Sequence, residues 1–130
     1  IGRAMKVGKE EIVGLLAAVE RYLKVDLEAE RRELEAKVAH LKEVVGRVRG
    51  VTVETHVPEI ANHVPHFVAS WDEGARGLTA KQAHEKLQAG APPIYVLLTG
   101  PGKLTVSVWT MRADEHRTVA RRLRDILAGA

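Results

Sequence analysis

The sequence contains no cysteine, few aromatic residues and no long apolar run, and each absence excludes a class of protein. Without cysteine there is no disulfide framework and no thiolate chemistry, which fits the cytosol. Aromatic residues make up 4% of the 130 residues, so the core has to be built from aliphatic side chains. No apolar run reaches the roughly 18 residues that a membrane helix needs, and no signal peptide is visible. We therefore expect a cytoplasmic protein with no membrane partner.

The remaining composition is typical of one folded domain with a mild positive charge. Hydrophobic residues make up 45% of the chain, which excludes a disordered polypeptide. The formal net charge is +3, and a charge this small does not by itself indicate a nucleic-acid partner. The chain does not begin with methionine, so we expect it to start inside a longer protein.

Two helices are expected in the first 49 residues. Apolar residues recur at intervals of three and four over residues 9–24, and Gly8 is placed to act as the N-cap. Asp26 can cap a second helix that runs to Arg49 and ends at Gly50. The apolar positions of this second helix form a narrow seam: Leu34, Val38, Leu41, Val45 and Val48. We predict that this seam is buried, either on a sheet of the same domain or against another subunit.

After Gly50 the pattern changes to that of strands and short helices. Four strands are predicted over residues 51–57, 67–71, 94–98 and 104–110, the third of them buried on both faces. Thr79, with Gln82 placed for a capping box, begins a short helix over residues 80–88, and residues 72–77 form a turn. Asp114 caps a last helix.

This order of elements predicts an α+β fold. Paired strands separated by helices indicate an antiparallel sheet of about four strands, with the helices packed on one face. We expect an N-terminal segment with long linking helices over residues 1–49, followed by a small α+β C-terminal domain over residues 50–130.

Two basic side chains precede the first helix and are candidates for binding an anion. Arg3 and Lys6 are three residues apart, and two cations at this spacing before a helix can clamp a phosphate or a carboxylate. The alternative is a solvated basic tail.

The basic run near the C-terminus also has two readings, because Arg117, Arg121 and Arg124 share a helical face that is either solvated or bound to nucleic acid. No stacking aromatic accompanies these arginines, so we expect no nucleic-acid partner.

Three histidines lie close together in the sequence, in the run H-V-P-E-I-A-N-H-V-P-H. His56, His63 and His66 could offer imidazoles to zinc, with Glu59 or Asp72 as a fourth ligand. Their spacing matches no standard zinc signature and no thiolate is present, so we predict no metal site. The other readings are surface or structural histidines, or histidines that line a substrate.

Two stretches of the chain carry a resemblance to a known family. The opening R-A-M-K-V-G-K-E-E-I-V-G-L-L and the run G-V-T-V-E-T-H-V-P-E-I-A-N-H-V-P-H-F are similar to the C-terminal part of fold-type I pyridoxal-phosphate (PLP) enzymes. The branch concerned holds the bacterial seryl-tRNA(Sec) selenium transferase and the glucosaminate-6-phosphate ammonia-lyase group. The K-V-G-K-E-E form of the opening motif favours the ammonia-lyase-like relatives.

The resemblance implies the C-terminal small domain of a PLP-dependent lyase or transferase. Such a domain closes over the active site and supplies anion-binding groups for α,β-elimination or replacement on an amino acid or amino sugar acid. Arg3 and Lys6 match the family's pair of cations at the active site, and Asn62, His63 and His66 fall in a region that often faces the substrate. The PLP lysine and its acidic partner would lie upstream of Ile1, so we expect no catalytic residue in this chain.

The implied partners are a missing N-terminal large PLP domain, a small anionic amino-acid or amino-sugar substrate, and further copies in a homo-oligomer. Two alternatives remain at this stage. One is a non-enzymatic α+β module for binding or dimerisation, and the other is a metal-binding domain built on the three histidines.

Overall fold

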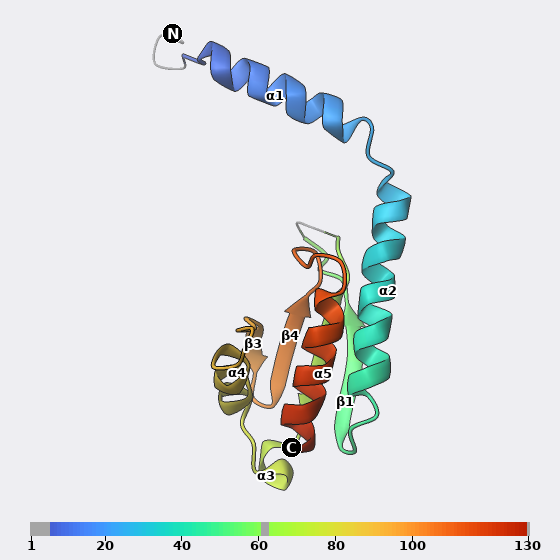
Figure 1. Ribbon diagram of the computed structural model, residues 1–130, viewed down its shortest axis with the longest axis vertical. Coiled ribbons are helices and arrows are strands. Elements are labelled where there is room, and N and C mark those ends of the chain that lie inside the picture. The colour runs from blue at the N-terminus through green and yellow to red at the C-terminus, as the bar shows by residue number, and fades with distance from the viewer. Residues whose placement is uncertain (1–5, 61–62, 130) are drawn as a thin grey trace. The chain divides into compact units, whose positions relative to one another are not determined.

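The computed structural model describes residues 6–60 and 63–129 and contains two compact units. Unit 1 is Ile1–Glu30 and unit 2 is Arg31–Ala130, and each is described here by itself. The element order is helix, helix, strand, strand, helix, helix, strand, strand, helix, in agreement with the α+β class predicted from the sequence (Figure 1). None of the helices over these described residues has the length and apolar character to cross a membrane.

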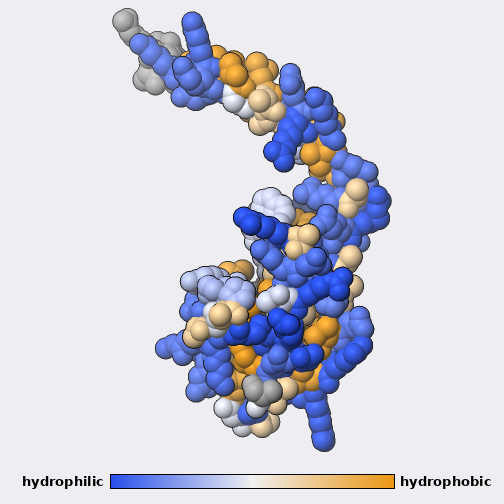
Figure 2. Space-filling view, viewed as in Figure 1, coloured by the Kyte–Doolittle hydropathy of each residue, from blue (hydrophilic) through white to orange (hydrophobic). Residues whose placement is uncertain are grey.

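Unit 1 consists mainly of helix α1, Lys9–Tyr22. Gly8 is its extended N-cap, and two glutamates in the first turn meet the positive end of the helix dipole. No residue of α1 is buried by the described residues of unit 1, and an apolar band along the helix is visible in Figure 2. The exposed apolar residues are Ile12, Val13, Leu15, Leu16, Val19, Tyr22 and Leu23.

Helix α2, Leu27–Val45, provides one side of the core of unit 2. Asp26 caps it as expected, because its carboxylate accepts a hydrogen bond from the Ala29 N–H at 2.9 Å. The apolar seam is buried in unit 2 itself from Leu34 to Val45, with Leu41 and Val45 fully inaccessible to solvent, whereas Val48 is only partly buried. The helix ends at Val45, earlier than Arg49, and a turn of irregular backbone leads to Gly50. Gly50 is therefore not the residue that ends the helix, although its positive φ of 75° marks the turn before the first strand.

The sheet of unit 2 has four antiparallel strands in the order β1-β2-β4-β3. Strand β1 is Val51–His56, β2 is His66–Trp71, β3 is Leu97–Gly100 and β4 is Lys103–Ser107. Phe67 lies opposite Val106 and Ala69 lies opposite Leu104, and these four side chains belong to the core. Directly opposite residues share a face of a sheet, so the intervening residues face the other way.

Three helices cover the core face of the sheet: α2, α4 (Ala80–Gln88) and α5 (Glu115–Ala128) (Figure 1). Each contributes buried residues to one continuous core, as expected for helices packed on a single face. Thr79 and Gln82 form the predicted capping box at the start of α4, with the Thr79 hydroxyl accepting from the Gln82 N–H at 3.1 Å.

Three local expectations were wrong. Residues 72–77 contain a short helix, α3 (Glu73–Arg76), capped by Asp72. Asp114 lies before α5 but makes no capping bond, because its backbone is left-handed (φ 66°) and its carboxylate binds Arg117 at 2.9 Å instead. The strand expected over residues 94–98 begins only at Leu97 and lies at the sheet edge, where Leu97 and Leu98 are exposed. The Ile94 N–H instead donates to the Leu87 carbonyl in the last turn of α4 at 3.0 Å, so this part of the run is bound to the helix and not to a neighbouring strand.

Glu73 joins the loop before α4 to the turn between β3 and β4. Its Oε1 accepts hydrogen bonds from the Ala80 N–H at 2.6 Å and from the Gly102 N–H at 2.8 Å. These two bonds, the first more than the second, lower the pKa of the Glu73 carboxyl below its usual value. The Glu73 carboxylate thus connects α3 to the start of α4 and to the turn between β3 and β4.

Candidate functional site

The face of the sheet without helices carries two of the three histidines singled out above. Residues 57–65 connect β1 to β2, and His56 lies directly opposite His66 at the base of this connection. His66 in turn lies opposite Ser107 on β4. Because Phe67 and Val106, their neighbours along the strands, point into the core, His56, His66 and Ser107 share the face that lacks helices.

His66 is the most constrained of the histidines. Its side chain is half-buried, and its Nδ1 lies 2.9 Å from the Val64 carbonyl oxygen. A carbonyl can only accept, so Nδ1 carries the hydrogen and Nε2 of the neutral ring is left with a free lone pair. The ring is therefore oriented to accept a hydrogen bond or a proton at Nε2.

The other residues expected near a substrate are not brought together in this way. His56 and His63 are exposed, and Asn62 lies outside the described residues. Over residues 6–60 and 63–129, no group of three histidine, cysteine, aspartate or glutamate side chains is arranged to hold a metal ion. Lys6 is exposed in unit 1, before α1, and Arg3 lies outside the described residues. The anion clamp of Arg3 and Lys6 thus stays a prediction.

A pocket of about 350 Å³ opens beside Ser107, and we call it the Ser107 pocket. It exists because β3 begins at Leu97, opposite Thr105, so that no strand pairs with Ser107 on that side. The lining residues are Pro92, Pro93, Ile94, Tyr95, Ser107, Thr110, Met111, Glu115, Thr118 and Val119. Hydroxyl groups and one carboxylate therefore face a partly apolar hollow, which suits a small polar molecule.

The carboxylate of the Ser107 pocket is held in place by the backbone just before α5. Glu115, in the first turn of α5, accepts a hydrogen bond from the Arg112 N–H at 2.8 Å. Tyr95 is largely exposed, so its phenol can meet a ligand at the mouth of the pocket. Sequence reasoning missed this pocket, although the pair Pro92–Pro93 was the signal that strand pairing must stop here.

An ion pair spans the centre of the sheet face that lacks helices. Lys103 on β4 reaches across to Glu54 on β1, with 3.2 Å between Nζ and Oε1. Val68, between them on β2, is 2% exposed although no helix covers it. Next to it, the hydroxyls of Thr99 and Thr105 lie 2.9 Å apart. Two pairs of polar side chains thus bind each other on this face, whereas the His66 Nε2 and the hydroxyls of the Ser107 pocket have no such side-chain partner among the described residues.

Comparisons with known proteins place the chain among larger enzymes. It is 30% identical over 129 residues to 5'-C-glycyluridine monooxygenase-decarboxylase of a Streptomyces species, an alignment that covers 98% of this chain and 32% of that protein. It is 25% identical over 128 residues to D-glucosaminate-6-phosphate ammonia lyase of Salmonella typhimurium, covering 97% of this chain and 34% of that protein. No protein-family model matches the sequence.

A solved structure of D-glucosaminate-6-phosphate ammonia-lyase has the same fold. It superposes with a TM-score of 0.70 and 25% sequence identity, over 98% of this chain and 34% of that one. The chain thus spans about a third of the length of the curated relatives that it matches. The preference for ammonia-lyase-like relatives, drawn from the opening motif, is confirmed. The chain is therefore similar to D-glucosaminate-6-phosphate ammonia-lyase and matches about one third of the length of that protein.

Proposed function

We propose that this chain is the small C-terminal domain of a PLP-dependent lyase or transferase. The observation that carries the proposal is the match of 98% of this chain to only 34% of an ammonia-lyase of the same fold. In such an enzyme the domain closes over the active site and supplies groups that bind the substrate, while another domain carries out the cofactor chemistry. In the intact protein, residues 1–49 would hold the linking helices and residues 50–130 would form the closing domain, against which the second of these helices packs. The protein would be a homo-oligomer located in the cytoplasm.

Two lysines that lie in or beside the sheet of unit 2, Lys37 and Lys103, do not fit the role of the PLP lysine. That role needs an amine free to form a covalent bond with the cofactor, close to an acidic partner for its ring nitrogen. Lys37, the buried lysine, has its Nζ 2.8 Å from Glu33 and 3.1 Å from the Met111 carbonyl oxygen. Lys103 is engaged by Glu54. PLP would therefore be held by the large domain, outside this chain.

The names of the two relatives favour an amino acid joined to a sugar frame as the substrate. Glucosaminate is an amino sugar acid, and a glycyluridine carries a glycine unit on a nucleoside. We propose α,β-elimination or replacement on an anionic substrate of this class, with Arg3 and Lys6 as its anion-binding pair. Asn62, His63 and His66 would line the substrate, and the free Nε2 of His66 and the hydroxyls of the Ser107 pocket support this orientation.

The exposed apolar stripe of α1 supports a further domain as the partner. Leu15, Leu16 and Val19 are 66%, 58% and 45% exposed, and apolar surface of this extent is costly to leave in water. The large domain would cover it in the intact protein.

The intact protein that contains this chain provides the test. Purified from cells, it should carry PLP, recognised by its visible absorption, and release ammonia from amino sugar acids. An intact protein that neither retains nor takes up PLP would contradict the proposal. The 130-residue chain is the control: mixed with PLP and reduced with borohydride, it should give no stoichiometric adduct at a defined lysine, and one such adduct would overturn the placement of the cofactor.

A further inference from the structure

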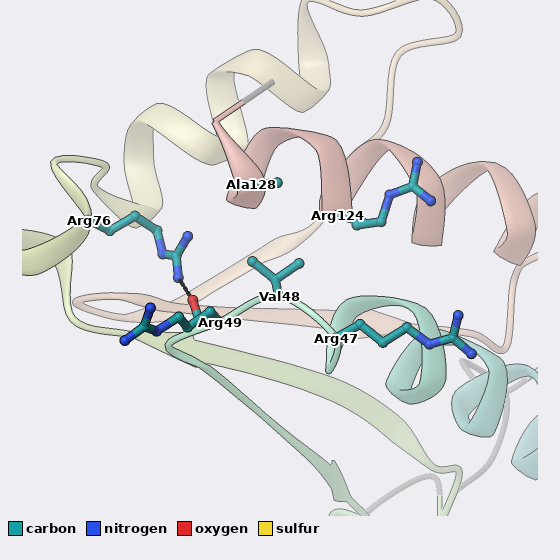
Figure 3. Close-up of a pocket in the computed structure, with 6 residues that line it drawn as sticks. All are labelled: Arg47, Val48, Arg49, Arg76, Arg124 and Ala128. Atoms are coloured by element: carbon teal, nitrogen blue, oxygen red, sulfur yellow. Dashed lines mark hydrogen bonds between the residues drawn. The ribbon is translucent and has the colours of Figure 1, made fainter.

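A second hollow, at the opposite end of β1 from His56, is lined mainly by arginines. It measures about 360 Å³ and lies where the turn after α2 meets α3 and the end of α5 (Figure 3). Its lining residues are Arg47, Val48, Arg49, Arg76, Arg124 and Ala128, with no acidic side chain among those described. An adjoining hollow of about 460 Å³ shares Arg49 and Arg76 and is also lined by Asp72, whose carboxylate caps α3 by accepting from the Ala75 N–H. These two arginines define what we call the Arg49–Arg76 pocket.

Arg76 is held rigidly, but by neutral groups. Its Nη1 donates to the Leu127 carbonyl in the last turn of α5, and its Nη2 donates to the Arg49 carbonyl. Gly50 allows this approach, because a Cβ there would lie 3.2 Å from Nη2. No carboxylate among the described residues forms an ion pair with Arg76, and its buried Nε has no acceptor there. The direct partners of this half-buried guanidinium are thus carbonyl groups, and the Asp72 carboxylate of the adjoining hollow forms no ion pair with it.

The guanidinium of Arg76 has donors left for a ligand. It carries five N–H groups, of which two bind carbonyls and one is the buried Nε–H, so two remain on Nη1 and Nη2. The Arg49 side chain lies on the same side of the pocket, as Figure 3 shows, and within the described part of the chain it too forms no ion pair. Two cations that form no ion pair with a described carboxylate therefore line the same pocket.

The other two arginines are already neutralised. Arg47 binds Glu43 and Arg124 binds Asp125, each at 2.6 Å. Their side chains extend toward the other end of the hollow, away from Arg76 (Figure 3). They add positive potential along the rim without competing for the same ligand, and Val48 and Ala128 form the apolar floor between the two ends.

We propose that the Arg49–Arg76 pocket binds an oxyanion of the phosphate class, either inorganic phosphate or the phosphoryl group of a small phosphate ester. A guanidinium fork matches two phosphate oxygens, and a group held in place before binding loses little conformational entropy when the ligand arrives. A dianion compensates both free cations, which a single carboxylate cannot do. If Arg76 served only to hold α3 against α5, the pocket would show no preference for such an anion.

The test is a calorimetric titration of the 130-residue chain with inorganic phosphate and, separately, with glycerol phosphate, at low ionic strength. We expect saturable binding at one site, weakened about tenfold by Arg49→Gln, the effect of losing one charge-assisted contact. Arg112→Gln, an exposed arginine outside the pocket, is the matched control and should bind as the wild type does. Tighter binding of the ester assigns the pocket to a phosphorylated molecule, and tighter binding of inorganic phosphate assigns it to the free ion.

Arg76→Lys keeps the charge but removes the fork, and should weaken binding while thermal unfolding shows that the fold persists. Two results would overturn the proposal. One is the absence of saturation with either ligand below about 10 mM. The other is an Arg49→Gln protein that binds phosphate as tightly as the wild type.

Discussion

His116 meets His40 edge to face, with 5.2 Å between the ring centroids and an interplanar angle of 86°, and the pair joins α5 to α2. Burial is the main reason why the pKa of His116 is lowered, and the nearby charges of His40, Arg117 and Lys37 add to the shift. Asp114 opposes it only in part. The Nδ1 of His116 is buried without a hydrogen-bond partner among the described residues. The contact between α2 and α5 is therefore more favourable when the His116 imidazole is neutral.

We predict that unit 2 loses stability as the pH falls through the range of histidine titration. Because the pKa of His116 is lower in the folded chain, the unfolded chain binds more protons below about pH 6.5. Stability is full above that pH and declines until His116 is protonated in the folded state as well. Urea unfolding at about pH 7.5 and 5.5 measures the decline. His116→Gln should show a smaller decline, whereas His56→Gln, at an exposed position, should behave as the wild type. Equal declines in all three proteins would contradict the prediction.

The seam of α2 provides a prediction on stability. Leu41 is fully buried in the core, so Leu41→Ala should lower the free energy of unfolding by about 2–4 kcal/mol. Leu15→Ala removes the same atoms from the exposed stripe of α1 and should change it by less than about 0.5 kcal/mol. Chemical unfolding of the 130-residue chain measures both. A loss below about 0.5 kcal/mol for Leu41→Ala would mean that the helix needs another domain to bury it.

The turn between β3 and β4 can be tested by replacing Gly102 with alanine, and the same replacement at Gly14 in α1 is the control. Gly102 has a φ of 56°, and a Cβ there would overlap the Trp71 carbonyl oxygen, so Gly102→Ala should destabilise unit 2 by more than about 1 kcal/mol. Gly14 lies in α1 with open space around it, so Gly14→Ala should raise the helix content and leave the unfolding of unit 2 unchanged. Circular dichroism during thermal unfolding separates the two effects. A Gly102→Ala chain as stable as the wild type would show that the turn rearranges freely.

The roles proposed for Arg3 and Lys6 can be tested in the intact protein that contains this chain, with the activity proposed for it. If Lys6 anchors an anionic group of the substrate, Lys6→Arg should keep much of kcat and Lys6→Ala should mainly raise KM. If it acts as a base instead, both changes should abolish kcat and move the basic limb of the pH profile. Arg3→Ala should cost about 2–4 kcal/mol in kcat/KM, the range for a charged contact in a desolvated site. Kinetics like those of the wild type for both alanine variants would identify the stretch as a basic linker.

Most elements of the fold could be predicted from the local pattern of apolar and polar residues. The alternation over Val51–His56 identified β1, and the seam from Leu34 to Val45 identified the buried face of α2, because side-chain period alone separates a half-buried strand from an amphipathic helix. The capping box of Thr79 and Gln82 was equally readable, since its bonds span three residues. The run from Ile94 to Leu98 was misread because apolar character does not distinguish a central strand from an apolar segment that leads into an edge strand.

The candidate sites depended on tertiary structure. The sequence by itself determined the fold class, the helix faces and the likeness to glucosaminate-6-phosphate ammonia-lyase, because these follow from local periodicity and from motifs contiguous in the chain. Only the tertiary structure placed Ser107 opposite His66, opened the pocket beside it, and brought Arg76 to the carbonyls of Arg49 and Leu127, which are 27 and 51 residues away in the chain. Strand register and helix packing decide such contacts, and both depend on the whole core and not on the propensity of any one segment.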